Sequence, residues 1–273
     1  MTWIPRLHLV ELEDLTFFPT LIRNYGTDYL RFIQARLELH LPMVDVLAKA
    51  LEAAGETKIV DLCSGGGGPT PSLVESLRAR SLDVTATLTD RFPNEVAAEE
   101  CAKESAFCLY SDQSVDATDV PPDLQGVRTI CNAFHHFAPK HAARVVASAA
   151  RGGNSVVVLE IPERKLSVIL STFLAPLMVM ISTPWIRPFR WSRLFFTYLI
   201  PLVPLLCLWD GIVSQLRAYT AEEMLKIAED SGVEGYRWEA KKISHPSLPL
   251  RLTYLVGHPE GGSAGGSVEE SEG

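Results

Sequence analysis

Two adjacent histidines are the side chains of this sequence best suited to proton transfer. His135 and His136 lie in NAFHHF, directly after a short apolar stretch, and an imidazole takes up and releases protons near neutral pH. Glu160 ends another apolar stretch, and a carboxylate can orient an imidazole and stabilise its charged form. If the two stretches are neighbouring strands, one histidine and Glu160 can form a dyad that removes a proton from a nucleophile. The alternative is that one histidine lines a pocket while the other packs under a helix.

A glycine cluster is the second feature with chemical meaning. In VDLCSGGGGPT, Asp61 and then Gly65 to Gly68 follow a β-branched stretch and precede a stretch typical of a helix, an arrangement that brings backbone N–H groups close to a ligand. The dinucleotide pattern G-x-G-x-x-G fails at Thr70, and the Walker pattern is absent. Asp61, at the mouth of the turn, would repel a phosphate but suits a cationic group such as the α-amino group of an amino acid. The turn therefore favours S-adenosylmethionine, unless Asp61 is only a helix cap and the glycines only a flexible turn.

The elements that must position these residues follow from the alternation of short apolar and amphipathic stretches. A helix is expected over 27–54, kinked or split at Pro42, and a capping-box spacing at Thr220 and Glu223 starts another. The predicted strands cover 58–62, 84–90, 107–110, 127–132, 155–160, 236–244 and 250–258. Strands this apolar, separated by helices, predict an α/β fold with a Rossmann-like, doubly wound, mostly parallel sheet and helices on both faces. An N-terminal helical extension and a hydrophobic helical insertion complete this expectation.

VDLCSGGGG resembles the first motif of class I S-adenosylmethionine-dependent methyltransferases, an acidic residue followed by G-x-G-x-G. On that match Gly65 and Gly67 take the second and third glycine positions, and Cys63 stands at the first. The resemblance covers about 58–160 and, more loosely, 220–257. The sequence resembles in particular a subgroup with a hydrophobic insertion after the fifth strand. It implies a Rossmann-like fold, methyl transfer and S-adenosylmethionine as cofactor.

Further landmarks of this family follow in the expected order. Asp90 ends the second strand, where the resemblance implies a carboxylate that accepts both ribose hydroxyls, unless it is a solvated strand end. The pair Asp116 and Ala117 corresponds to the pair implied against the adenine, although Asp116 could equally form a turn. Asn132 stands where the family commonly contacts the methionine moiety. NAFHHF is also similar, over a short stretch, to the His-Glu pair of carbon-methylating domains in polyketide synthases, which favours His135 as the base.

The stretch 166–209 differs in composition from the rest, because 29 of its 44 residues are apolar. As one helix, the uncharged part 166–186 would be about 31 Å long, enough to cross a bilayer core. Arg187, Arg190 and Arg193 follow it, which disfavours a spanning hairpin. Three arrangements stay open: a lid packed over the site, an anchor in the surface of a membrane, and a span. An apolar insertion at this place predicts a lipophilic acceptor such as a lipid, polyketide, isoprenoid or quinone.

Composition excludes several classes of protein. The 273 residues carry a formal net charge of -8 and no long basic run, which argues against nucleic acid as a partner. The five cysteines show neither metal-ligand nor disulfide spacing, so we expect no metal site and a reducing, cytoplasmic compartment. Acidic residues interrupt the N-terminal stretch where a signal peptide would be apolar. Contact with a membrane through 166–209 stays open, and nothing indicates the oligomeric state.

The sequence thus predicts five parts and one function. The parts are an N-terminal helical cap (1–57), a cofactor-binding α/β core (58–165), the insertion (166–209), the C-terminal part of the core (210–258) and a disordered tail (259–273). The expected function is S-adenosylmethionine-dependent methyl transfer to a small, lipophilic acceptor. The alternatives are a NAD- or nucleotide-binding oxidoreductase, and a non-catalytic membrane-associated protein that retained the cofactor fold.

Overall fold

Seven strands form one sheet in the computed structural model, which describes residues 4–260. Their order is β3-β2-β1-β4-β5-β7-β6, with β1 to β5 parallel and β7 antiparallel to both of its neighbours. The strands are β1 (Lys58–Leu62), β2 (Thr85–Asp90), β3 (Cys108–Ser114), β4 (Val127–Cys131), β5 (Val156–Glu160), β6 (Tyr236–Ser244) and β7 (Arg251–Pro259). The predicted Rossmann-like, mostly parallel sheet is confirmed.

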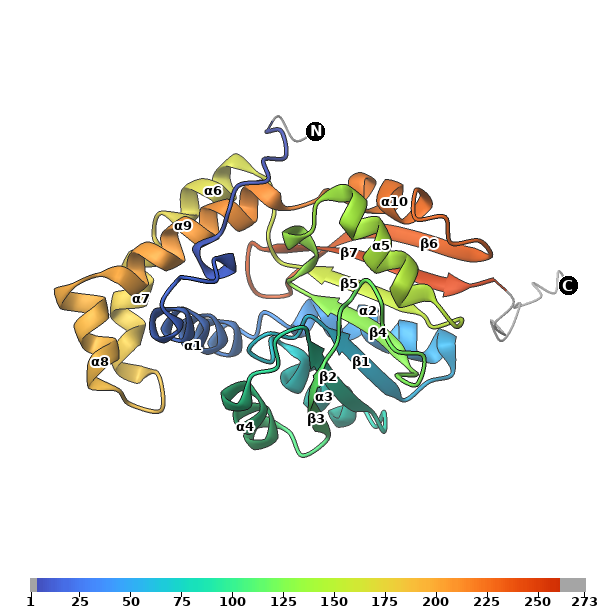
Figure 1. Cartoon of the computed structure of the whole chain (residues 1–273), viewed down its shortest axis with the longest axis horizontal. Coiled ribbons are helices and arrows are strands. Elements are labelled where there is room, and N and C mark those ends of the chain that lie inside the picture. Colours follow the sequence, from blue (N-terminus) through green and yellow to red (C-terminus); the bar gives the residue numbers. More distant parts are fainter. Residues whose placement is uncertain (1–3, 261–273) are drawn as a thin grey trace, which may run out of the picture.

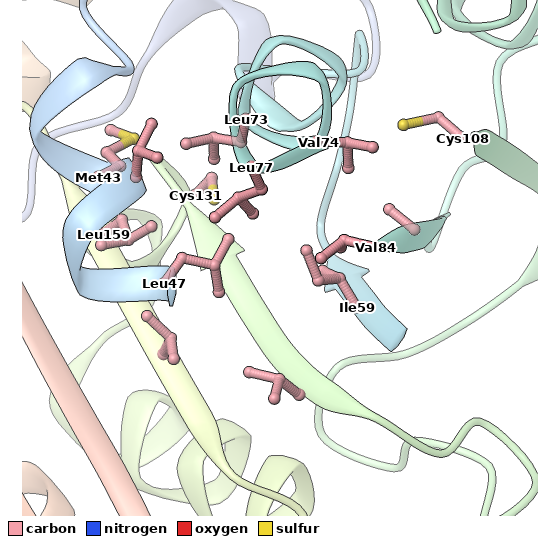
Figure 2. Packing of buried hydrophobic residues seen from close by; sticks show 14 of the residues in the cluster. Met43, Leu47, Ile59, Leu73, Val74, Leu77, Val84, Cys108, Cys131 and Leu159 are labelled. Carbon is pink, nitrogen blue, oxygen red and sulfur yellow. The ribbon is translucent and has the colours of Figure 1, made fainter. Parts of the chain in front are cut away.

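Helices cover both faces of the sheet because its central strands are apolar on both sides. Successive residues of β5, from Val156 to Leu159, alternate between two buried clusters, one on each face. The covering helices are α2 (Leu41–Ala54), α3 (Thr70–Ala79) and α4 (Glu95–Glu104) on one face, and α5 (Pro139–Ala150) and α10 (Ala221–Glu229) on the other. Figure 2 shows Leu47 of α2 and Leu77 of α3 pointing to the strands. This packing fixes the strand ends that carry the candidate site.

Local signals set several element boundaries. Thr220 and Glu223 form the expected capping box at the start of α10. The helix expected over 27–54 is two helices, α1 (Thr20–Arg36) and α2, and Pro42 lies in the first turn of α2, where its missing N–H needs no partner. At the other end of the chain, β7 reaches residue 259, so the expected tail overlaps this strand. The rest of that prediction, for 261–273, lies outside the described residues.

The apolar stretch folds into several short helices beside the sheet (Figure 1), and we call residues 166–217 the arm. The arm contains α6 (Leu166–Thr172), α7 (Ala175–Ser182), α8 (Trp191–Leu194) and α9 (Leu202–Arg217), with the short η3 (Thr183–Trp185) and η4 (Phe195–Leu199) between them. The expected helical insertion is present, but 166–186 does not form one helix: the chain breaks before α7, where Pro176 cannot donate the hydrogen bond of a helix interior. The expected boundary at residue 209 falls inside α9.

The N-terminal part is shared between the arm and the sheet. α1 packs against α7 and α9 in a cluster that includes Tyr25, Val179 and Leu206, whereas α2 covers the sheet. The buried Arg193 of α8 pairs with Asp28 of α1 at 2.5 Å. In Figure 1, α1 lies beside the arm, and the extended segment before it runs along α9. The expected cap over 1–57 is therefore not one unit.

Much of the apolar surface of the arm is exposed. Trp185, Trp191 and Leu199 are 69%, 78% and 71% exposed, and Phe17, close to the start of α1, is 80% exposed. Within residues 4–260, none of the helices alone has the length and apolar character to cross a bilayer. Two pairs of arm helices reach the required length together, but they are bent by 41° and 72°.

Candidate functional site

Four of the predicted site residues lie at the ends of neighbouring strands. Asp61 and Asp90 belong to the last residues of β1 and β2, while Asn132 and Glu160 follow β4 and end β5. Because these strands are parallel and adjacent, their carboxyl ends meet at one edge of the sheet, where open α/β folds bind ligands. This edge is the candidate active site. The glycine turn lies on its β1–β2 side and the histidines lie on its β4–β5 side.

The turn after β1 has a backbone that usually requires glycine. Gly65, Gly67 and Gly68 have φ angles of 50°, 98° and 51°, and Cys63, at the first glycine position of the motif, has φ 60°. A side chain is strained in this region, so Cys63 adopts the glycine conformation at an energetic cost. A Cβ on Gly65 or Gly68 would meet no atom within 4 Å. The turn therefore leaves open space for a ligand beside its backbone.

Asp61 lies beneath this turn. Its side chain is 1% exposed, and its carboxylate accepts hydrogen bonds from the hydroxyls of Ser64 and Thr129 at 2.7 and 2.6 Å. Burial raises the pKa of Asp61, and these hydrogen bonds act in the opposite direction. Asp61 therefore does not stand at the mouth of the turn, as the sequence predicts, but lies buried beneath it. Its carboxylate holds the turn in place through the hydrogen bond from Ser64.

Asp90 is joined directly to the glycine turn. Its Oδ2 accepts the N–H of Gly65 at 2.8 Å, and its Oδ1 accepts the N–H of Phe92 at 2.8 Å. Asp90 is partly exposed, and each carboxylate oxygen can accept a further hydrogen bond. The carboxylate is therefore fixed by the backbone and still has acceptor capacity for a ligand.

The pair Asp116 and Ala117 is divided between a turn and the core. Asp116 Oδ1 accepts the N–H and the hydroxyl of Thr118 at 2.8 and 2.7 Å, and these hydrogen bonds lower the pKa of Asp116. Its Oδ2 lies 3.6 Å from the guanidinium of Arg91. The Ala117 side chain is buried in the cluster under α5 and α10. One oxygen of Asp116 thus forms a turn, and only the backbone of Ala117 can face a ligand.

Asn132, like Cys63, is a non-glycine residue with a positive φ at this edge of the sheet, in its case 54°. Its Oδ1 accepts the N–H of Ile161 at 2.9 Å, whereas its buried Nδ2 has no hydrogen-bond partner within residues 4–260. An unsatisfied buried donor costs about 1–3 kcal/mol. The amide is therefore positioned for a ligand that offers an acceptor atom.

His135 and Glu160 are in direct contact. The Glu160 carboxylate accepts the Nδ1–H of His135 at 2.5 Å through Oε2 and the N–H of Phe134 at 2.8 Å through Oε1. This arrangement turns Nδ1 of His135 to Glu160 and leaves Nε2 on the opposite side of the ring. His135 is only 3% exposed, and its Nε2 lies 3.8 Å from Glu11 Oε1, so the imidazole does not face open solvent. His136 is more accessible, with 25% of its side chain exposed.

The N-terminal segment supplies site residues that no sequence pattern placed here. Glu11 is 1% exposed, with Oε1 3.0 Å from Arg217 of α9 and Oε2 3.5 Å from Nε2 of His136. Asp14 accepts hydrogen bonds from His136 Nδ1 at 3.1 Å and from Arg217 at 2.8 Å. Their only signal in the sequence is that they interrupt an apolar N-terminal stretch, and this signal names no partner.

Carboxylates of the N-terminal segment dominate the electrostatics around the histidines. Burial raises the pKa of Glu13 to about 7. Burial alone would also raise the pKa of Asp14, but hydrogen bonds from His136 and Arg217 outweigh it and hold the pKa at about 2. For His136, burial lowers the pKa, but Asp14 and Glu11 raise it to about 9. This part of the site therefore attracts positive charge.

Comparisons with known proteins bear on the fold. Neither protein-family models nor curated proteins contain a match to this sequence. Among solved structures, the plantazolicin methyltransferase BpumL in complex with SAH has a TM-score of 0.56 and 11% identity, covering 91% of this chain and 94% of that one. Human N-acetylserotonin methyltransferase in complex with SAM has a TM-score of 0.51 and 12% identity, covering 93% and 64%.

A third similar structure is the O-methyltransferase NcsB1 from neocarzinostatin biosynthesis, in complex with SAM and 2-hydroxy-5-methyl naphthoic acid. Its TM-score is 0.50 at 16% identity, with 89% of this chain and 59% of that one covered. The chain spans about three fifths of the length of several such O-methyltransferase structures. At these identities the likeness shows the fold, which is that of class I methyltransferases.

Proposed function

We propose that this chain, which has the class I methyltransferase fold, transfers a methyl group from S-adenosylmethionine to a small lipophilic acceptor. The observation that carries the proposal is Asp90 at an open glycine turn, fixed there by the N–H of Gly65. Across the same sheet edge lies a histidine held by a carboxylate, His135 with Glu160. The proposed cofactor site and the proposed activating group would thus lie at one edge of the sheet, at the ends of adjacent strands.

The residues of the turn suit the chemistry of this cofactor. Burial and the carboxylates of Asp90, Asp61 and Asp116 raise the pKa of the Cys63 thiol, so the surroundings of the turn are negative and suit a sulfonium or ammonium group. The unpartnered Nδ2 of Asn132 suits the carboxylate of the methionine moiety.

The remaining contacts complete the proposed cofactor site. Asp90 would accept the ribose hydroxyls with its free acceptor capacity. Gly65 and Gly67 shape the turn, and Asp116 with the backbone of Ala117 would lie against the adenine. When bound, S-adenosylmethionine supplies an activated methyl group on a sulfonium ion.

The histidine side of the edge would activate and orient the acceptor. Glu160 fixes the tautomer and direction of His135, and Asp14 does the same for His136. Orientation of the attacking atom is a large part of what such a transfer requires, and removal of its proton adds to it. We therefore assign acceptor activation to His135, His136 and Glu160.

The arm supports a lipophilic acceptor and contact with a membrane surface. Its exposed aromatic residues, among them Trp185 and Trp191, are typical of segments that lie at the boundary of head groups and acyl chains. The exposed Arg187 and Arg190 lie between them in the chain and suit anionic head groups. We propose that the arm rests on a membrane surface and gives the site access to an apolar acceptor.

Labelled methyl transfer tests the proposal. The full chain is incubated with methyl-labelled S-adenosylmethionine and vesicles made from a lipid extract, and the organic phase is analysed for labelled product. We expect label in an apolar product, and at limiting S-adenosylmethionine at least tenfold less label with Asp90→Ala. Tighter binding of NAD than of S-adenosylmethionine in calorimetry would favour the oxidoreductase alternative. Absence of S-adenosylmethionine binding would favour a non-catalytic membrane-associated protein.

A further inference from the structure

Three side chains of metal-ligand type converge between the N-terminal segment and η2 (Phe134–His136). Glu11, His135 and His136 each offer one donor atom, and these atoms lie within 4.8 Å of one another. Oε2 of Glu11 lies 3.5 Å from Nε2 of His136, and Oε1 lies 3.8 Å from Nε2 of His135. Two ligands that each lie ~2.1 Å from a tetrahedral ion are about 3.4 Å apart. The spacing is thus longer than a good hydrogen bond and close to that of two ligands of one ion.

Both imidazoles are held from behind by carboxylates. Nδ1 of His135 donates to Glu160 at 2.5 Å, and Nδ1 of His136 donates to Asp14 at 3.1 Å. Both Nε2 atoms are consequently left on the side of Glu11. Histidines that bind metals almost always donate their other ring N–H to a carboxylate or carbonyl, which fixes the ring and makes it a better ligand. Here two histidines, each held by its own carboxylate, have their second ring nitrogen on the side of Glu11. This is the arrangement that a metal ion with two histidine ligands needs.

The carboxylate of Glu11 is oriented in the same way. Its Oε1 accepts a hydrogen bond from the Ser214 hydroxyl at 3.1 Å and lies 3.0 Å from the guanidinium of Arg217. Oε2 lies towards His136, whereas His135 is nearest to Oε1. Three carboxylates, those of Glu11, Asp14 and Glu160, touch the two imidazoles, while Arg217 is the guanidinium paired with them among the described residues. The cluster therefore has negative charge to share with a cation.

We propose that Glu11, His135 and His136 bind one divalent transition-metal ion, of the Zn²⁺ or Fe²⁺ type. Two imidazoles and one carboxylate are the donors of many catalytic zinc sites and of non-haem iron sites, and they leave coordination positions open. A metal ligand is a neutral imidazole, so each histidine would bind the ion through an unprotonated Nε2. With the ion bound, His135 and His136 would act as its ligands and not as bases, and the ion would activate an oxygen or nitrogen atom of the acceptor. This role rests on the proposed function, whereas binding of the ion does not.

Titration of the full chain, after treatment with a chelator, tests the site. We expect calorimetry to show one Zn²⁺ or Co²⁺ per chain. Because the five cysteines are the competing donors, bound Co²⁺ should lack the near-ultraviolet absorption of thiolate ligands. Glu11→Gln and His136→Ala should each weaken binding at least tenfold. His141→Ala, which removes an exposed histidine of α5, should leave it unchanged.

Thermal unfolding of each metal-free variant controls for the fold. His136 is partly exposed, so its substitution keeps the test decisive even if the buried Glu11 proves necessary for folding. Less than one equivalent bound by the wild type, or unchanged binding by His136→Ala, would overturn the inference. The affinity for S-adenosylmethionine, measured on the same metal-free protein, reports separately on the proposed function, because the glycine turn contains none of the three ligands.

Discussion

The sheet and the arm are both rich in large apolar residues, but they use them differently. All five residues of β5 are buried, and the clusters on its two faces are closed by helices of the same chain. In the arm, one side packs on α1, whereas Trp185, Trp191 and Leu199 remain mostly exposed. Exposed apolar patches of this kind mark surfaces that bind something else. The sheet is therefore apolar for folding, whereas the exposed apolar surface of the arm is what the proposed membrane contact would use.

Among the changes considered, introducing charged residues on the exposed side of the arm should have the largest effect, and this effect should be on vesicle binding. In Trp185→Glu/Trp191→Glu/Leu199→Glu, three side chains each lose about 1.5–3 kcal/mol of apolar burial at a membrane. We expect the affinity for anionic vesicles, measured by co-sedimentation, to fall at least ~10³-fold. The free energy of unfolding should stay within ~0.5 kcal/mol of that of the wild type.

The matched control for the arm is Phe92→Glu/Leu109→Glu, which alters two exposed apolar residues outside the arm, 77% and 68% exposed. Its vesicle binding should equal that of the wild type. If the triple variant of the arm sediments like the wild type, the arm is a lid and not a membrane contact.

Shortening a buried side chain that packs on the sheet should lower the free energy of unfolding, whereas shortening an exposed side chain of the arm should not. Leu77→Ala removes a fully buried side chain of α3 and should lower the free energy of unfolding by about 3 kcal/mol, because it leaves a cavity. Leu205→Ala changes a side chain of α9 that is 54% exposed and should cost less than ~0.5 kcal/mol. Urea unfolding measures both, and equal losses would mean that the arm surface is part of the folding core.

The chemistry should depend on the sheet edge. Glu160→Gln removes the charge that orients His135, and we expect the turnover number to fall about 10²-fold while the affinity for S-adenosylmethionine stays the same. His135→Ala/Glu160→Gln should be barely worse than either single variant, because the two groups act as one unit. Glu239→Gln, at an exposed position of β6, is the control. Small, additive losses would show that the pair only supports the fold.

The smallest of these effects should be on cofactor affinity. Asp90→Ala removes hydrogen-bond acceptors next to Gly65, so calorimetry should show an affinity for S-adenosylmethionine at least tenfold lower, a loss of about 1.4 kcal/mol. Asp119→Ala, whose side chain is 80% exposed, should bind normally. Unchanged affinity of a folded Asp90→Ala would remove Asp90 from the site.

Much of the sheet and half of the site could be predicted from the sequence because their signals are local. The strands and the capping box of Thr220 depend on residues a few positions apart, and so does the glycine turn with Asp90 one βαβ unit later. For the arm, the sequence showed only a stretch rich in apolar residues and did not predict how its helices pack. Its broken helices follow from Pro176 and from packing on α1, and α1 precedes it by more than a hundred residues.

The sequence by itself determined the α/β class, the strand that ends in the glycine turn, and the positions of His135 shortly after β4 and Glu160 at the end of β5, because periodicity and turn residues act over short distances. The tertiary structure decided that Asp61 is buried beneath the turn, and that Glu11 and Asp14 meet the histidines. Asp14 and its partner Arg217 are 203 residues apart in the chain. Such contacts depend on how the N-terminal segment lies along α9, and no local pattern encodes that packing.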